Sequence, residues 1–102
     1  MEINGLSTMN IDNKDYWTLK NFSQLTKKTE YTIRMLIAKG NRLGKLKALK
    51  IGNSVYIEAE ELFNYKFVTN GRPNALSDCF ETFYLENGEL YKKEKGRVSQ
   101  FF

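Results

Sequence analysis

Apolar residues recur at helical spacing between residues 29 and 40, and this segment predicts the best-defined helix of the chain. Ile33, Leu36 and Ile37 share one face, which can therefore be buried. Thr29 can cap the N-terminus with its hydroxyl, and Gly40 permits the left-handed conformation that often ends a helix. The opposite face carries aromatic, basic and small side chains: Tyr31, Arg34, Met35 and Ala38. A helix with such a face can enter a DNA major groove, although an ordinary amphipathic helix has the same pattern.

A shorter helical pattern precedes this segment. Apolar residues at i, i+3 and i+6 predict a helix over residues 19–25, which Thr18 can cap, after a short extended piece at Tyr16 and Trp17. Only residues 26–28 separate the two predicted helices. Two short helices joined by three or four residues form a helix-turn-helix, in which the second helix is the recognition helix.

Two runs of strand-forming residues follow, at 46–51 and 55–57, and the Gly52-Asn53 pair between them is typical of a tight hairpin turn. Because the first run carries lysines, the pair predicts a basic β-hairpin, or wing. Wings lie along the DNA backbone or minor groove, where lysines contact phosphate without reading sequence. Residues 57–67 then predict a third helix with acidic residues in its first turn.

The last third of the chain, residues 69–102, is expected to be an extension with a basic tail. Apolar residues from Ala75 onward recur with 3.6 spacing and favour a helix over about 75–87. The alternative is a hairpin that turns at Asn87-Gly88, in which Glu86 and Glu89 would face each other with like charge. We favour the helix, whose aromatic face would either complete the core or pair with a second chain.

The predicted fold class is α+β, a small winged helix-turn-helix over residues 16–68 with an extra C-terminal helix. It consists of two helices, a β-hairpin wing and a third helix, preceded by a flexible arm at residues 1–15. The 102 residues are 41% hydrophobic and 27% charged, which suits a single folded domain. Since the chain shows neither a bilayer-spanning apolar run nor a secretory leader, we expect a cytoplasmic protein with no membrane partner.

Positive charge is concentrated in residues 27–50. Eight of the sixteen Lys and Arg residues lie there, but only one of the twelve Asp and Glu residues, so the local balance is +7 against −3 for the rest of the chain. Localised positive charge is the electrostatic footprint of a polyanion partner. A solvated basic surface is the ordinary alternative in small proteins, but the localisation favours nucleic acid.

The missing residue types and motifs argue against an enzyme. The chain has no histidine, which is the commonest general base and metal ligand. Its single cysteine, Cys79, can form neither an internal disulfide nor a Cys-rich zinc site. No phosphate-cradling or nucleophile-elbow motif occurs. We therefore expect no catalytic residues, no metal and no cofactor.

The order of the predicted elements over residues 16–67 resembles the winged-helix excisionase/MerR-like DNA-binding family. That family shows an aromatic-Leu-Thr-like entry, a T-[VI]-x-x-L-I-x-x-G recognition helix, a K-[VI]-G-x-x-[WY]-x-[IV] hairpin and an E-x-L-x-x-[YF] closing helix. The positions that carry the resemblance here are Thr32, Ile33, Leu36, Ile37, Gly40, Lys50, Ile51, Gly52, Tyr56, Glu61, Leu62 and Tyr65. Tyr56 lies one place beyond the usual aromatic of the hairpin motif. The chain also departs from the pattern in the turn at residues 27–29, where members usually have Gly-Val-Ser, and in the basic loop before residue 50.

The resemblance implies a double-stranded DNA-binding protein, either an excisionase-like accessory factor in recombination or a small transcriptional regulator of a mobile element. Besides DNA, its partner would be a recombinase or the chain itself, as a homodimer or an array on DNA. We expect base reading from the second helix, at Tyr31, Thr32, Arg34 and Met35. We expect phosphate contacts from the surrounding basic residues, namely Lys27, Lys28, Lys39, Arg42, Lys45, Lys47 and Lys50. The alternative is a protein-interaction module of the same fold that binds an acidic protein partner.

Overall fold

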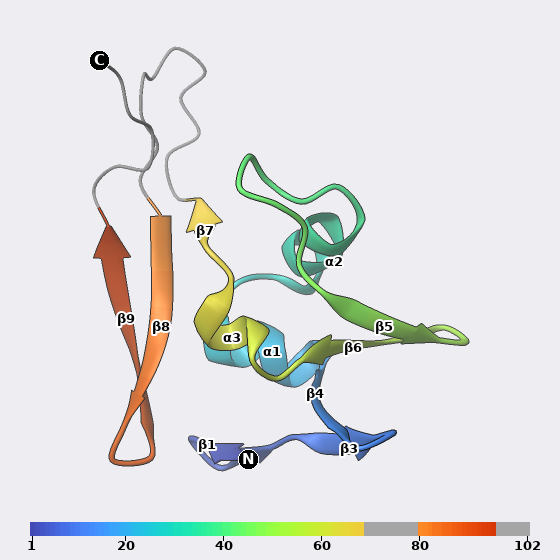
Figure 1. The fold of residues 1–102 in the computed structure, drawn as a ribbon, viewed down its shortest axis with the longest axis horizontal. Helices are drawn as coiled ribbons and strands as arrows, with labels where there is room; N and C mark the ends of the chain where they lie inside the picture. Colours follow the sequence, from blue (N-terminus) through green and yellow to red (C-terminus); the bar gives the residue numbers. More distant parts are fainter. Residues whose placement is uncertain (69–79, 96–102) are drawn as a thin grey trace.

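The computed structural model describes residues 1–68 and 80–95, which form three short helices and nine strands (Figure 1). The helices are α1 (Leu19–Thr26), α2 (Glu30–Ala38) and α3 (Glu61–Asn64). The strands are β1 (Glu2–Ile3), β2 (Leu6–Ser7), β3 (Met9–Ile11), β4 (Lys14–Thr18), β5 (Ala48–Ile51), β6 (Ser54–Glu58), β7 (Phe67–Val68), β8 (Phe80–Glu86) and β9 (Glu89–Lys95).

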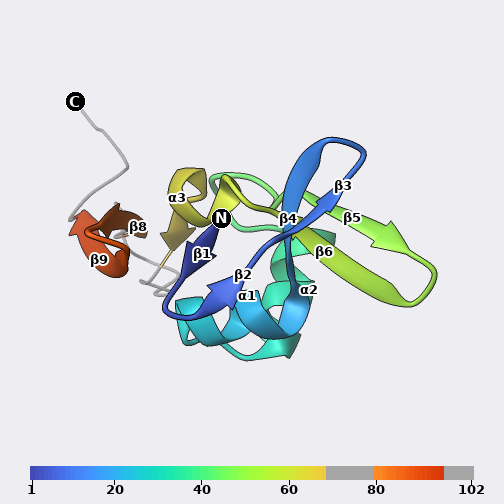
Figure 2. The same ribbon diagram turned by 90° about the horizontal axis from the view of Figure 1, so that it is seen from below.

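The strands form three antiparallel sheets. β1 and β2 form a two-stranded sheet, β3-β4-β6-β5 a four-stranded sheet, and β7-β8-β9 a three-stranded sheet. β4 is the link in the larger sheet, because it pairs with β3 on one side and with β6 on the other, where Trp17 lies opposite Ile57. The tips of the β3–β4 and β5–β6 hairpins lie at the opposite end of the molecule from the β8–β9 hairpin (Figures 1 and 2).

All three sheets contribute to one hydrophobic core. Its buried members come from the first strand, both longer helices, the β4–β6 pair, α3 and the β7–β9 sheet: Ile3, Trp17, Leu19, Phe22, Leu25, Ile33, Leu46, Ile57, Ala59, Leu62, Tyr65, Phe67 and Phe83. A chain of this length can bury only one such core, so the sheets depend on each other for stability.

The first two predicted helices are confirmed, together with their caps. The Thr18 hydroxyl accepts a hydrogen bond of 3.1 Å from the Asn21 N–H at the start of α1, and Thr29 accepts one of 3.1 Å from the Thr32 N–H at the start of α2. Lys27 ends α1 with a φ of 59°, which turns the chain sharply toward α2. The predicted hairpin at residues 52–53 is also present, between β5 and β6.

The fold as a whole is not the helix-rich winged helix with a C-terminal helix that the sequence predicted. Within the described residues the chain contains more strand than helix, in three antiparallel sheets. The third helix, predicted over 57–67, is only the single turn α3. Ile57 and Glu58 belong to β6 instead, and Phe67 begins β7. Pairing of Ile57 with β4 buries its side chain completely, and this tertiary contact overrides the local helical pattern.

The N-terminal arm predicted at residues 1–15 is also wrong, because these residues form β1 to β3 and the start of β4. Asn4 and Gly5 turn the first hairpin with φ values of 53° and 83°, and Asp12 and Asn13 turn the second with 52° and 67°. These residue types tolerate positive φ at low cost and suit two-residue hairpin turns. Ile3 is fully buried in the core, so this segment is a structural part of the domain.

The C-terminal helix predicted over about 75–87 is wrong in its described part, residues 80–87, which belong to the β8–β9 hairpin. Residues 75–79 and the end of the predicted basic tail, residues 96–102, lie outside the described residues. The hairpin turns at Asn87 and Gly88, as the rejected alternative proposed.

The like charges that argued against this hairpin do face each other across it. Glu86 pairs with Glu89 in the register, but both side chains are exposed, and repulsion between exposed charges is weak in water. Phe83 on the inner face is buried against the core, and Tyr84 stacks on Tyr91 on the outer face. These two contacts outweigh the repulsion at the turn.

Because the first strand is part of the core, the Ile3→Ala variant should be strongly destabilised. We expect the free energy of unfolding to fall by about 2–4 kcal/mol, as for other buried Ile-to-Ala changes. Chemical denaturation followed by circular dichroism measures this. Met9→Ala, at a side chain that is 42% exposed in β3, is the matched control and should change stability by about 0.5 kcal/mol or less. Equal, small effects in both variants would contradict the described packing of β1.

Candidate nucleic-acid interface

Helix α2 buries one side and exposes the other, as its spacing predicted. Ile33 is fully buried, and Leu36 and Ile37 are half-buried against the core. On the other side Tyr31 is 71% exposed and Arg34 is exposed. The helix therefore presents an aromatic and a guanidinium group to solvent, and such side chains can make apolar contacts and hydrogen bonds to base edges in a DNA groove.

The other two predicted base-reading residues are less available to contact DNA, one because of burial and the other because of a hydrogen bond. Met35 is half-buried. Thr32 is exposed, but its hydroxyl accepts a hydrogen bond of 2.9 Å from the Thr29 hydroxyl, which itself accepts from the Thr32 N–H. This reciprocal pair fixes the first turn of α2 and orients the Thr32 side chain.

A shallow groove of about 290 Å³ runs between α1, α2 and the tip of the β5–β6 hairpin. It is lined by Glu30 and Arg34 from α2, by Thr18, Leu19 and Lys20 around the start of α1, and by Asn53, Ser54, Val55 and Tyr56 from the hairpin. Sequence reasoning missed the contribution of Lys20, Asn53 and Tyr56 because they lie on α1 and on the hairpin, which only the tertiary fold brings beside α2. The one sequence feature that they share is a polar side chain close to a predicted helix cap or hairpin turn.

The basic loop between α2 and β5 is held by backbone hydrogen bonds at both ends. Asn41 and Gly44 exchange two backbone hydrogen bonds of 3.0 and 3.1 Å, and the Leu46 N–H donates to the Leu36 carbonyl at 3.1 Å. Leu46 is buried, which anchors the end of the loop in the core. Gly40 begins the loop at a φ of 76°, and a Cβ there would lie 2.6 Å from the Gly44 carbonyl oxygen.

Helix α3 and the residue after it clamp the same loop from the other side. The Tyr65 hydroxyl donates to the Gly44 carbonyl at 2.7 Å, and the Asn41 side-chain amide donates to the Lys66 carbonyl at 3.0 Å. The carboxylate of Glu61 accepts from the Lys47 N–H at 3.0 Å. Burial raises the pKa of Tyr65 above its ordinary value, so its hydroxyl keeps its proton and remains a donor at neutral pH.

The predicted phosphate-binding residues, with one exception, are exposed. The exposed ones are Lys27, Lys39, Arg42, Lys45, Lys47 and Lys50. Within the described residues, the five lysines of this set form no ion pair with an acidic side chain. Their charge is therefore not neutralised by an ion pair, and along the chain it lies on the turn before α2, at its C-terminal end, and on the loop and strand that follow.

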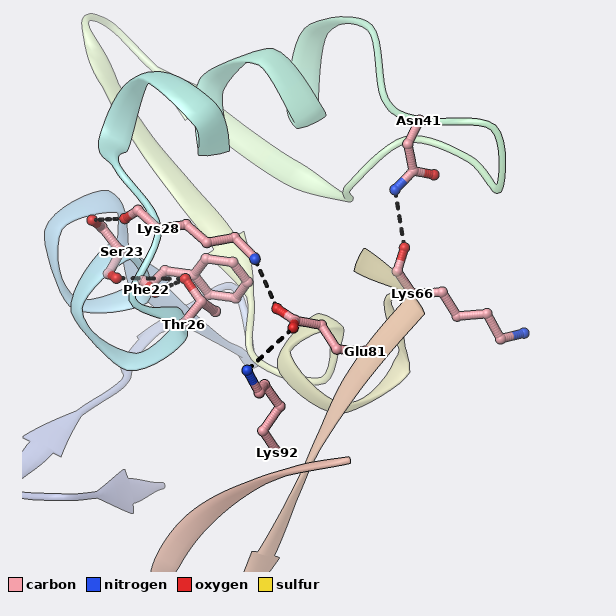
Figure 3. A network of polar contacts seen from close by, with 8 residues as sticks. All are labelled: Phe22, Ser23, Thr26, Lys28, Asn41, Lys66, Glu81 and Lys92. Atoms are coloured by element: carbon pink, nitrogen blue, oxygen red, sulfur yellow. Dashed lines mark hydrogen bonds and ion pairs between the residues drawn. The ribbon is translucent and has the colours of Figure 1, made fainter. Parts of the chain in front are cut away.

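Lys28 is the exception, because its amine faces inward (Figure 3). Its Nζ lies 2.7 Å from Glu81 Oε1 and 5.3 Å from the ring centroid of Phe67. Glu81 is only 5% exposed, and its other oxygen lies 3.5 Å from the amine of Lys92. Lys28 thus joins the α1–α2 turn to β8, and it is not among the cations that the structure presents to a ligand.

The described residues contain neither a candidate metal site nor a helix that could span a membrane. Among residues 1–68 and 80–95, no three His, Cys, Asp or Glu side chains are grouped so that they could hold a metal ion. No helix in that part of the chain is long and apolar enough to cross a membrane. Cys79 lies outside the described residues.

Comparison with known proteins identifies no relative of this chain. A scan against protein-family models, a search of curated proteins and a search of solved structures all found no match. The chemistry of the surface around α2 is therefore the basis for assigning a function.

The backbone of Gly44 lies so close to Gly40 that a side chain at position 40 should destabilise the basic loop. Gly40→Ala should lower the free energy of unfolding by about 2–4 kcal/mol, because the new Cβ would meet the Gly44 backbone in addition to the strain of positive φ. Gly52→Ala is the matched control: its φ is 60°, but nothing lies within 4 Å of the added Cβ, so only about 1 kcal/mol should be lost. Thermal unfolding followed by circular dichroism compares the two. A loss at Gly52 as large as that at Gly40 would contradict the loop geometry.

Proposed function

We propose that this protein binds double-stranded DNA through α2, the basic loop that follows it and the β5–β6 hairpin. The observation that carries the proposal is a set of five exposed lysines, on the turn before α2, at its end and on the loop and strand that follow it: Lys27, Lys39, Lys45, Lys47 and Lys50. Lysines that no acidic side chain neutralises, concentrated in one segment, attract a polyanion, and displacing the counterions of DNA makes the association favourable.

The dimensions of α2 suit the DNA major groove. A helix with its side chains is about 10–12 Å across, close to the roughly 12 Å width of the groove, and the nine residues of α2 give two and a half turns that can lie in it, at about 3.6 residues per turn. Arg34 is the best candidate for base reading, because an exposed guanidinium can donate two hydrogen bonds to a guanine edge. Glu30 lies one helical turn before Arg34 and lines the same groove of the protein surface. Its carboxylate can accept a hydrogen bond from the cytosine amine.

The lysines of the loop and hairpin would position α2 rather than read sequence. Lys45 and Lys47 lie where α3 and Tyr65 clamp the backbone, so their positions are defined before DNA binds. Contacts from such lysines to phosphate supply affinity for any duplex and set the register of the helix in the groove.

Two biological roles agree with a small DNA-binding protein of this kind, and both follow from the resemblance of residues 16–67 to excisionase/MerR-like proteins. One is an accessory factor for a recombinase, and the other is a small transcriptional regulator of a mobile element. A recombinase would be the protein partner in the first role, and a repeated or symmetric site would be expected in either.

The proposal is tested first by the salt dependence of binding to random duplex DNA. The Lys45→Ala/Lys47→Ala variant should bind more weakly than the wild type, and the slope of log K against log salt should be shallower by about two units, one per phosphate contact. Fluorescence anisotropy across a salt series gives both quantities. The matched control is Lys14→Ala/Lys92→Ala, which removes two exposed lysines outside the segment 27–50 and should keep the wild-type slope.

Absence of binding by the wild type at low salt would overturn the proposal and would favour an acidic protein as the partner of this surface. Equal loss of slope in both double variants would show that DNA senses only net charge. In that case the surface around α2 would not be the specific DNA-binding site.

Sequence reading is tested separately at Arg34. A preferred site is selected from a random duplex pool with the wild-type protein, and the Arg34→Ala variant is then measured on that site and on single-base changes of it. Loss of a bidentate guanine contact should remove about 1–3 kcal/mol of discrimination at one position, or roughly 5- to 150-fold. Lys47→Ala should instead weaken all the sequences alike. Unchanged discrimination in Arg34→Ala would exclude it as a base reader.

A further inference from the structure

The β8–β9 hairpin has an outer face that the core does not use. Alternation along β8 directs Glu81 and Phe83 inward, where both are buried, and directs Thr82 and Tyr84 to the opposite side. On that side Tyr84 stacks on its cross-strand partner Tyr91, with ring centroids 5.6 Å apart at an interplanar angle of 26°. The two rings are 44% and 41% exposed, so a pair of aromatic residues stands in solvent at the middle of the face.

The end of this face nearest the hairpin turn is acidic. Glu86 and Glu89 are cross-strand partners two positions beyond the tyrosine pair, and both are exposed. The Tyr91 hydroxyl donates to Glu89 Oε1 at 3.2 Å, which places that carboxylate beside the aromatic pair. The same carboxylate raises the pKa of the Tyr91 hydroxyl above its ordinary value.

The other end of the face is basic. Lys93 lies opposite Thr82, two positions from the tyrosine pair in the other direction. Lys66, just before β7, directs its amine to 5.7 Å from the ring centroid of Phe80. Figure 3 shows the Lys66 side chain pointing away from Glu81, which marks the inner side of β8. Two exposed lysines therefore balance the two exposed glutamates across the tyrosine pair.

This arrangement is complementary to itself under a two-fold rotation. A two-fold axis that lies in the plane of the face, and crosses the strands at right angles through the tyrosine pair, would bring the acidic end of one copy over the basic end of another. Each end is about 7 Å from the axis, at two residues of strand rise. We infer that two copies of the chain pack through the outer faces of their β8–β9 hairpins, with Tyr84 and Tyr91 at the centre. Exposed aromatic side chains within a charged rim are typical of protein interfaces.

A second copy explains this face better than nucleic acid does. If nucleic acid bound this face, Glu86 and Glu89 would lie against its phosphates and would repel them. A symmetric partner instead supplies a lysine for each glutamate. Dimerisation also leaves α2 and the β5–β6 hairpin free, because the hairpin tip lies at the opposite end of the molecule from β8 and β9, and α2 lies between the two (Figure 1). The inference does not rest on DNA binding, and its test uses no DNA in its main arm.

The experiment uses charge reversal at the two ends of the face. Sedimentation velocity is measured from about 5 to about 500 µM, which covers the micromolar Kd expected of a small interface. The wild type should shift toward twice the chain mass as its concentration rises. Glu86→Lys/Glu89→Lys makes both ends basic, and Lys66→Glu/Lys93→Glu makes both ends acidic, so each variant alone should remain monomeric. An equimolar mixture of the two variants should dimerise again, because each acidic face then meets a basic one.

Lys45→Glu/Lys47→Glu changes the net charge as much as the Lys66 and Lys93 pair but lies away from the hairpin, so it should dimerise like the wild type. Circular dichroism confirms that each variant is folded before it is compared. A wild type that stays monomeric at the highest concentration would overturn the inference. Dimerisation of the wild type without rescue in the mixture would place the interface elsewhere. If Lys66→Glu/Lys93→Glu lowers the salt slope of DNA binding in a monomeric wild type, the face belongs to nucleic acid instead.

Discussion

The aromatic ring of Phe67 is the contact on which the arrangement of the domain depends. It is 1% exposed and lies 6.3 Å from the ring centroid of Phe22 in α1 and 5.6 Å from that of Phe83 in β8. Tyr65 packs edge-on against the same ring at 4.9 Å, and the Lys28 amine lies over it. Edge-to-face aromatic packing of this kind contributes area and geometry together. It joins the helix pair and the β7–β9 sheet into one core and thereby fixes the orientation of the helix pair relative to that sheet.

Buried polar groups then shape the basic surface. Glu61, although charged, is 8% exposed, and its carboxylate accepts the Lys47 N–H, while the Tyr65 hydroxyl caps the Gly44 carbonyl. Buried polar atoms are costly unless they are hydrogen-bonded, so these partners tie the loop to α3. The consequence is that a segment rich in lysine, which by itself would repel its own charges, is held in one conformation beside α2. A surface that is ordered before binding loses less conformational entropy when it binds.

Part of the basic surface around α2 could be predicted from the sequence, and part could not. The exposed face of α2, with Tyr31 and Arg34, follows from helical periodicity, because the buried positions define the exposed ones. The groove that Lys20 and Tyr56 line with Arg34 depends on how α1 and the hairpin pack, which periodicity does not encode. The high number of Lys and Arg residues in 27–50 predicted that Lys28 would bind phosphate with the others. Its pairing with a carboxylate 53 residues away is a tertiary contact that no count of local charge predicts.

The sequence by itself determined the elements whose stabilising interactions span only a few residues. Thr18 and Thr29 cap helices through hydrogen bonds to residues three positions ahead, and Gly52 permits a tight turn wherever the flanking strands pair. Tertiary structure decided the rest. Residues 1–15 became strands because Ile3 fills the core and β4 pairs with β6, about forty residues later in the chain. Residues 80–95 became a hairpin because burying Phe83 against Phe67 outweighs a helical pattern that competes with it only locally. Such contacts join segments far apart in sequence, and local propensity is a weak preference that they override.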